Sequence, residues 1–127
     1  SRVEMMYERV LKEKVFMAFL NPEKIKKMMS KYYHKIPEVL RNNRGRAREL
    51  LVNCEEAIEY KKLYNNDRHE IKVLDSGVVF ASDIIITDNK IFMVGYSESE
   101  VAGTEIWNEE LAKTQKAVFE IVWKMQA

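Results

Sequence analysis

The sequence predicts a single α/β domain over residues 1–127, in which helices flank a mixed sheet. Three observations support this fold class. The length suits one domain, and 46% hydrophobic residues are enough to form a core. Helical and strand patterns alternate through the first half of the chain. The second half contains mainly short strand patterns, and a helical pattern closes it.

The first half predicts helix, strand, helix, strand, helix, the order of a parallel α/β layer. A helical apolar repeat opens the chain, at Val3, Met6, Tyr7, Val10 and Leu11. The apolar run 15–20 predicts a strand buried on both faces. Asn21 and Pro22 suit the cap and first position of a helix. Within that helical pattern, Pro37 predicts a kink or a second helix start, and Gly45 predicts the end.

The second strand of the layer is predicted at residues 49–54. Asn53 and Glu56 stand three residues apart, which is the spacing of a capping box. They predict the start of a helix that carries four apolar or aromatic residues: Ala57, Tyr60, Leu63 and Tyr64.

The second half predicts strands at 69–75, 78–87, 90–96 and 101–107. Asp88 and Asn89 form a two-residue hairpin turn, because both residue types tolerate positive φ. The last helix begins near Asn108, and Glu109 and Glu110 suit the positive end of its dipole. Its apolar stripe is Leu111, Val118, Val122 and Met125, widened by Ala117 and Ile121.

Charge and cysteine content restrict the function classes. Lys and Arg number 21 against 20 Asp and Glu, so nucleic-acid binding by this segment alone is disfavoured. Cys54 is the single cysteine, and no apolar run has the length of a membrane span, so we expect a cytoplasmic protein without a membrane anchor. Because the chain begins with Ser1 and not with Met, we expect it to be part of a longer protein.

The last third resembles a known family. The stretch from Asp83 to Lys124 has a hairpin with a D-x-K turn, a strand and a helix of the type ELAKTQKAVFEIVW. The matching residues are Asp88, Lys90, Thr114, Gln115, Phe119 and Trp123. These features are similar to the C-terminal region of TrmB-like transcriptional regulators of archaea and bacteria, and the resemblance extends over nearly the whole chain.

The resemblance implies a fold and a function. Such regulators carry an N-terminal winged helix that binds DNA, a linker, and a C-terminal domain with the fold of one phospholipase D half. This chain would be that C-terminal effector or dimerisation domain, and it would contact DNA only through a winged helix absent from the chain. The expected partners are a second copy and a small effector, either a sugar or an anionic metabolite. A plain protein-interaction module without a ligand is a further interpretation.

The catalytic motif of phospholipase D-like enzymes, H-x-K-x4-D, is mostly missing. On this hairpin its three positions are Ala81, Asp83 and Asp88. Alanine has no nucleophile, and Asp83 would repel a phosphate by about 1–4 kcal/mol. We therefore predict no enzyme activity and no cofactor. The alternative is a diverged phosphodiesterase or nuclease, in which His34 or His69 would have to approach Asp88 and a lysine.

Basic and aromatic residues are candidates for ligand binding. Arginines bind anions in bidentate fashion, although cations at a helix end also complement its dipole. The candidate ligand-binding residues are Arg41, Arg44, Arg46, Arg48 and Tyr96. Neither histidine has Asp, Glu or Cys at metal-ligand spacing, so no metal site is predicted. Cys54 is predicted to be a buried or capping thiol.

Apolar residues of the last helix exceed what one core requires, which predicts a second contact. The candidate dimer interface is Val118, Phe119, Val122 and Trp123. A symmetric homodimer would suit palindromic operators.

Overall fold

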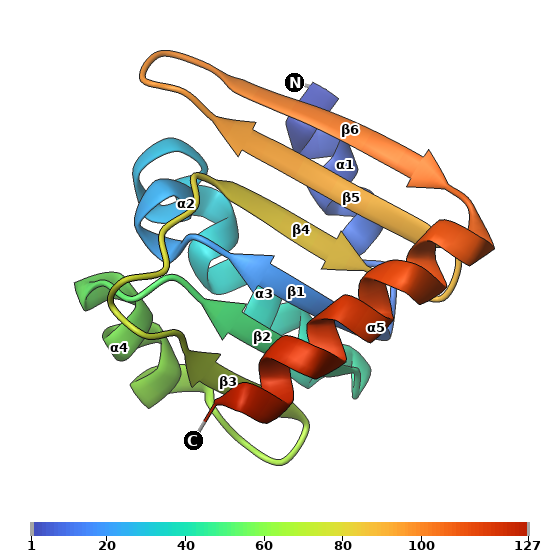
Figure 1. The fold of residues 1–127 in the computed structure, drawn as a ribbon. Helices are drawn as coiled ribbons and strands as arrows, with labels where there is room; N and C mark the ends of the chain where they lie inside the picture. The colour runs from blue at the N-terminus through green and yellow to red at the C-terminus, as the bar shows by residue number, and fades with distance from the viewer. Residues whose placement is uncertain (1, 127) are drawn as a thin grey trace.

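The computed structural model describes residues 2–126, which form a three-layer α/β/α fold (Figure 1). Helices α1 to α4 cover one face of a six-stranded sheet, and α5 covers the other. The elements in chain order are α1 (Arg2–Val10), β1 (Val15–Leu20), α2 (Pro22–Met28), α3 (Ser30–Asn43), β2 (Arg46–Leu51), α4 (Glu55–Tyr64), β3 (His69–Val73), β4 (Ser82–Ile86), β5 (Lys90–Tyr96), β6 (Val101–Trp107) and α5 (Glu109–Met125). The predicted α/β class with a mixed, helix-flanked sheet is confirmed.

The sheet has the strand order β3-β2-β1-β4-β5-β6. Strands β1 and β2 are parallel, as the first half predicts, and β3, which is predicted as part of the second half, is a third parallel strand. Strands β4, β5 and β6 are joined in antiparallel pairs. Strand β1 lies in the centre between β2 and β4, which explains its continuous apolar sequence. The C-terminal ends of β1, β2 and β3 meet the start of β4 at one edge of the sheet.

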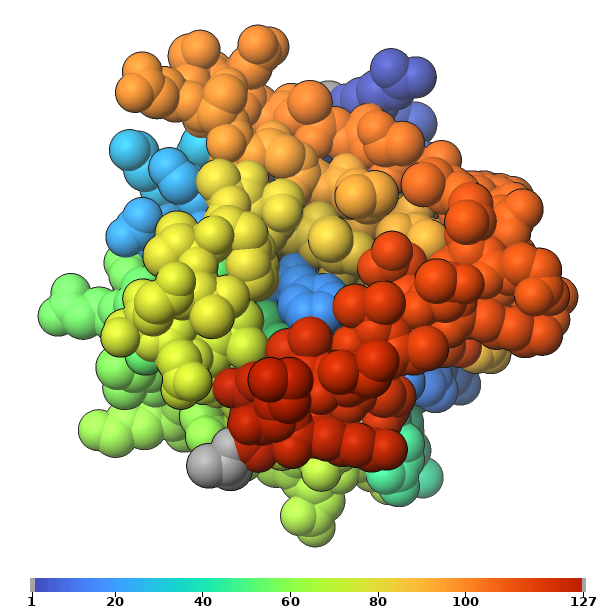
Figure 2. Space-filling view, in the orientation of Figure 1, coloured from blue at the N-terminus to red at the C-terminus, as the bar shows by residue number. Residues whose placement is uncertain are grey.

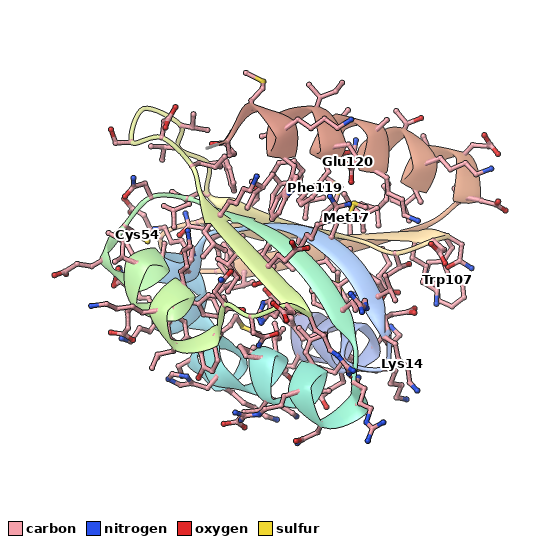
Figure 3. All side chains as sticks on the ribbon, turned by 90° about the horizontal axis from the view of Figure 1, so that it is seen from below. Lys14, Met17, Cys54, Trp107, Phe119 and Glu120 are labelled. Carbon is pink, nitrogen blue, oxygen red and sulfur yellow. The ribbon has the colours of Figure 1, made fainter. Side chains whose placement is uncertain are left out.

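Each sheet face has its own hydrophobic core. Helices α1 to α4 pack their apolar stripes on one face, where Tyr7, Tyr32 and Phe92 are buried. On the other face, α5 lies diagonally across the strands and buries Ala112 and Phe119. Figure 3 shows α5 on the opposite side of the sheet from the other helices, with Phe119 directed towards Met17.

The long helical pattern after residue 21 contains two helices that separate at Met29, upstream of Pro37. Pro37 lies inside α3 and starts no helix. The predicted terminator also differs, because Arg44 takes the left-handed conformation, with φ 57°. Gly45 is required for space: a Cβ there would lie 2.7 Å from the carbonyl oxygen of Lys14.

Strand β2 begins at Arg46, three residues before the predicted start, and ends at Leu51. All six residues pair in parallel with β1, from Val15 opposite Arg46 to Leu20 opposite Leu51, so strand pairing determines these bounds. The predicted capping box is wrong. Cys54 caps α4 without a side-chain hydrogen bond, and Asn53 donates from Nδ2 to the carbonyl oxygen of Leu74 instead.

The β4–β5 hairpin is shorter than predicted, because residues 78–81 precede the strand. Its turn is closed by a hydrogen bond of 3.0 Å from Thr87 N to the Lys90 carbonyl. Asp88 and Asn89 both have negative φ, so the expected positive-φ turn does not form. The last helix is capped as predicted, with Asn108 Oδ1 accepting from Leu111 N at 2.9 Å. No helix within residues 2–126 is long and apolar enough to cross a membrane.

Candidate functional site

The hairpin positions of the phospholipase D motif lie in three different environments. Ala81 is an exposed methyl group just before β4. Asp88 is exposed at the turn, where its carboxylate accepts from Nζ of Lys116 on α5 at 2.5 Å. Asp83 is fully buried on the face that α1 covers. The central position of the motif is therefore inaccessible to a phosphate in this conformation.

Asp83 is the centre of a buried polar group that we call the Asp83 cluster, formed with Tyr7, Tyr96 and Asn21. Both tyrosine hydroxyls donate to Asp83 Oδ2 at 2.5 Å, and Asn21 N donates to Oδ1 at 2.8 Å. Tyr7 comes from α1, Tyr96 from the end of β5, and Asn21 from the start of α2. The cluster therefore joins one helix, the start of another and two strands.

Burial raises the pKa of Asp83 from its ordinary value of 3.8 to about 6, although the three donated hydrogen bonds act to lower it. The hydroxyl oxygens of Tyr7 and Tyr96 are also 2.9 Å apart, so these two oxygens and Asp83 Oδ2 form a triangle. Both hydroxyls donate to the carboxyl group, so the contact between Tyr7 and Tyr96 has no proton of its own while Asp83 is ionised. Burial outweighs the three donated hydrogen bonds and sets the direction of the pKa shift.

Asn21 extends the cluster to the surface. Its Oδ1 caps α2 by accepting from Lys24 N at 3.1 Å, and its Nδ2 donates to the Phe80 carbonyl at 2.7 Å. Phe80 lies in the segment 74–81, which connects β3 to β4. These hydrogen bonds form one path from Phe80 through Asn21 and Asp83 to Tyr7 on α1.

A groove opens beside this path on the α5 face of the sheet. We call it the α5 groove. It lies between α5 and segment 74–81, has a volume of about 560 Å³, and is a hollow with β1 at its floor in Figure 2. Its lining residues are Phe19, Leu74, Asp75, Val78, Phe80, Ser82, Ile84, Gln115, Val118, Val122, Met125 and Gln126.

The lining of the α5 groove suits binding better than catalysis. Eight of its twelve residues are apolar, and the volume lies within the usual range for small-molecule sites. Asp75 is the one ionisable side chain among these described lining residues. Within residues 2–126, no group of three His, Cys, Asp or Glu side chains could hold a metal ion.

A second buried polar group joins β2, β3 and α4. Glu49 Oε1 lies 2.5 Å from His69 Nε2 and accepts from the Tyr60 hydroxyl at 2.9 Å. Burial lowers the pKa of His69, but the charge and hydrogen bond of Glu49 outweigh this effect and raise it above 6.5. Glu49 Oε2 has no hydrogen-bond partner among the described residues.

The structure separates the predicted ligand-binding residues. Arg48 extends to α5, where it pairs with Glu120 and lies over Phe119. Arg41 lines a pocket of about 250 Å³ on the opposite face, Arg44 follows the end of α3, and Arg46 is exposed at the start of β2. Tyr96 belongs to the Asp83 cluster. These five side chains do not meet at one pocket.

The candidate dimer residues on α5 also differ in environment. Phe119 is fully buried against the sheet and stacks on Trp123, with ring centroids 5.7 Å apart. Val122 is partly buried in the α5 groove, whereas Val118 is 44% exposed. Of the four, Val118 is the one clearly available for contact with another protein.

The remaining candidates have local partners. His34 hydrogen-bonds through Nδ1 to the Tyr64 hydroxyl, and the Cys54 thiol donates to the Val52 carbonyl at 3.4 Å. Burial raises the pKa of Cys54, so its thiolate is disfavoured. His69 lies on β3 and Asp88 follows the end of β4, and these strands are three places apart in the sheet, about 14 Å at ordinary strand spacing. The two residues that the phosphodiesterase alternative would bring together are therefore separated.

The Asp83 cluster was missed because its members lie far apart in the sequence. One signal was present. Asp83 alternates with Ile85 in a mostly apolar strand, so it occupies a core-facing position where a charged residue needs buried partners.

Comparison with family models and with curated proteins finds no match for this chain.

Proposed function

We propose that this chain is the non-catalytic effector and dimerisation domain of a TrmB-like transcriptional regulator in the cytoplasm. DNA binding would belong to a winged helix elsewhere in the protein, as the sequence resemblance implies. The α5 groove is the observation that carries the proposal, because it offers a mostly apolar volume suited to a small molecule, and its described lining contains no histidine, cysteine or lysine.

The groove favours a particular class of effector. Its described lining is mostly apolar, and the one ionisable residue in that lining, Asp75, is acidic. An anionic metabolite would meet repulsion there, whereas an apolar molecule with a hydrogen-bond donor or a cationic group would be complementary. We therefore propose an effector of this kind in place of the anionic metabolite that the arginines suggested.

Binding in the groove has a physical route to the first helix. A ligand that displaces Phe80 would disturb the hydrogen bond from Asn21 to the Phe80 carbonyl. Asn21 is bonded in turn to Asp83, which accepts from Tyr7 on α1. A ligand shifts DNA affinity only by its differential affinity for two conformations, so movement of α1 relative to the sheet is the proposed second conformation.

A thermal-shift screen tests the ligand-binding part. Amphipathic amines and other apolar compounds are compared with sugars, sugar phosphates and nucleotides; a ligand at a hundred times its Kd should add about 2.7 kcal/mol to the unfolding free energy. Ser82→Phe fills the groove from β4 and should abolish the response. Thr104→Phe places the same side chain at an exposed position on β6, outside the groove lining, and should keep it.

The outcomes separate the competing interpretations. Stabilisation by sugar phosphates that persists in Ser82→Phe would contradict the groove assignment. No stabilisation by any compound would favour a plain interaction module. The regulator assignment is tested in the full-length protein, by measuring DNA binding by fluorescence anisotropy with and without the stabilising compound.

A further inference from the structure

Helix α5 has a second apolar surface besides the one that packs on the sheet. Ala112 and Phe119 face the sheet and are fully buried. Four other apolar residues of the helix are exposed: Leu111 (49%), Val118 (44%), Ile121 (63%) and Met125 (76%). We call these four residues the outer stripe. Along the helix these residues are spaced 7, 3 and 4 positions apart.

This spacing is the a and d pattern of a coiled-coil seam, with Thr114 at the remaining d position. The stripe runs from residue 111 to 125, about 21 Å along the helix axis. A helical face of this kind is adapted to pack against another helix, since side chains three and four residues apart lie on one side.

The charges beside the stripe indicate which helix packs there. Glu110, Ala117 and Lys124 follow one another at seven-residue intervals along one flank. In an antiparallel pair of α5 helices, each Glu110 lies opposite Lys124 of the other copy, and the two Ala117 methyl groups meet at the two-fold axis. A parallel pair would place each Glu110 beside Gln115 of the other copy and would bring no acidic side chain to Lys124, so it would lack both ion pairs. Antiparallel packing also opposes the two helix dipoles.

We propose that two copies of this chain associate through an antiparallel, two-fold symmetric pairing of α5, centred on Ala117. The inference rests on the dimerisation part of the proposed function and specifies its surface. The proposed interface consists of the outer stripe and its charged flank. It does not include the predicted Phe119 and Trp123, because these two side chains pack on the sheet side of α5. Val118 and Met125 also line the α5 groove, so the partner helix borders the groove of each copy. Effector binding and dimer geometry are thereby linked.

Sedimentation velocity over a range of protein concentrations tests the pairing. Ile121→Glu should weaken self-association by more than about tenfold, because it places a charge in the seam of both copies. Ile58→Glu is the matched control: Ile58 is 55% exposed on α4, away from the stripe, and its substitution should leave self-association unchanged. Circular dichroism and the melting temperature of each variant verify folding.

A charge exchange tests the orientation. Glu110→Lys and Lys124→Glu should each weaken self-association about fivefold, because each converts two attractive pairs into two repulsive ones. The double variant E110K/K124E restores both pairs and should return to within about twofold of the wild-type Kd. A parallel pairing predicts a different result, with no loss in the single variants.

Two results would overturn the inference. A dimer whose Kd is unchanged by Ile121→Glu and by both charge reversals associates through another surface, although dimerisation itself would stand. A folded protein that stays monomeric at all concentrations would refute both the pairing and the dimerisation part of the proposed function. The effector part would then depend on the thermal-shift screen alone.

Discussion

Replacement of the buried carboxyl group in Asp83→Asn should make the domain more stable at neutral pH. In the protein, Asp83 is buried and its pKa is raised from 3.8 to about 6. A side-chain amide is close in shape to the neutral acid. Its oxygen can accept from Asn21 N, and its NH₂ group can donate to the hydroxyl oxygens of Tyr7 and Tyr96. It cannot ionise, so it never carries a buried charge.

The expected magnitude follows from the pKa. For an acid whose pKa is higher in the folded state, the stabilising contribution is fully present below pH 3.8 and is lost as the pH rises through about 6. The total loss is about 3 kcal/mol, since a tenfold change in an equilibrium constant corresponds to about 1.4 kcal/mol. About 1 kcal/mol is already lost at pH 4.5, so the stability difference between variant and wild type should grow by about 2 kcal/mol between pH 4.5 and 7.5.

Urea unfolding at several pH values, followed by tryptophan fluorescence, measures this difference. Asp88→Asn is the matched control on the same hairpin, because Asp88 is exposed and its pKa is lowered by the hydrogen bond from Lys116. Its stabilising contribution is lost as the pH falls, so the control should show a pH dependence of opposite sign. If Asp83→Asn is equally destabilising at every pH, Asp83 is ionised in the folded protein and the reasoning fails.

Three further substitutions have definite expected results. Gly45→Ala should cost about 1–3 kcal/mol in urea unfolding, because its Cβ would lie 2.7 Å from the Lys14 carbonyl oxygen; a neutral effect would show that the loop yields easily. Asn108→Ala should cost about 1 kcal/mol through loss of the α5 cap, whereas Asn108→Ser should retain most of it. Glu49→Gln should lower the pKa of His69 below 6.5 in an NMR titration, since burial then dominates. In the wild type the stabilising contribution of His69 is present below pH 6.5 and lost as the pH rises through its folded pKa, so an unchanged pH dependence in this variant would contradict the assignment.

The elements could be predicted from the sequence because their signals are local. The bounds of β5 and β6 agree with the predicted residues 90–96 and 101–107, and Asn21 and Asn108 cap helices as expected. Boundaries set by distant residues could not be predicted. Strand β2 starts at Arg46 because six residues of β1 pair with it. Helix α3 ends at Asn43, where Arg44 takes the left-handed conformation and Gly45 lies close to the Lys14 carbonyl oxygen.

The candidate site depended on tertiary structure for the same reason. The α5 groove is formed by β1, β4, segment 74–81 and α5, which come from the beginning, middle and end of the chain. The predicted arginines are close in sequence, but Arg41 and Arg44 belong to the end of α3 on one side of the sheet, whereas Arg48 extends from β2 to α5 on the other. Nearness in sequence was therefore a poor guide to a shared pocket.

By itself, the sequence determined the fold class, the parallel pattern of the first half, the hairpin of strands near residues 82–96, and the absence of a histidine at position 81. Periodicity and residue type decide these properties without reference to distant contacts. Only the tertiary structure decided that Asp83 is a buried acid held by Tyr7 and Tyr96, 76 and 13 residues away, and that a groove opens beside it. A pKa and a cavity arise from groups that folding brings together, and their positions exist only once the sheet and its helices are assembled.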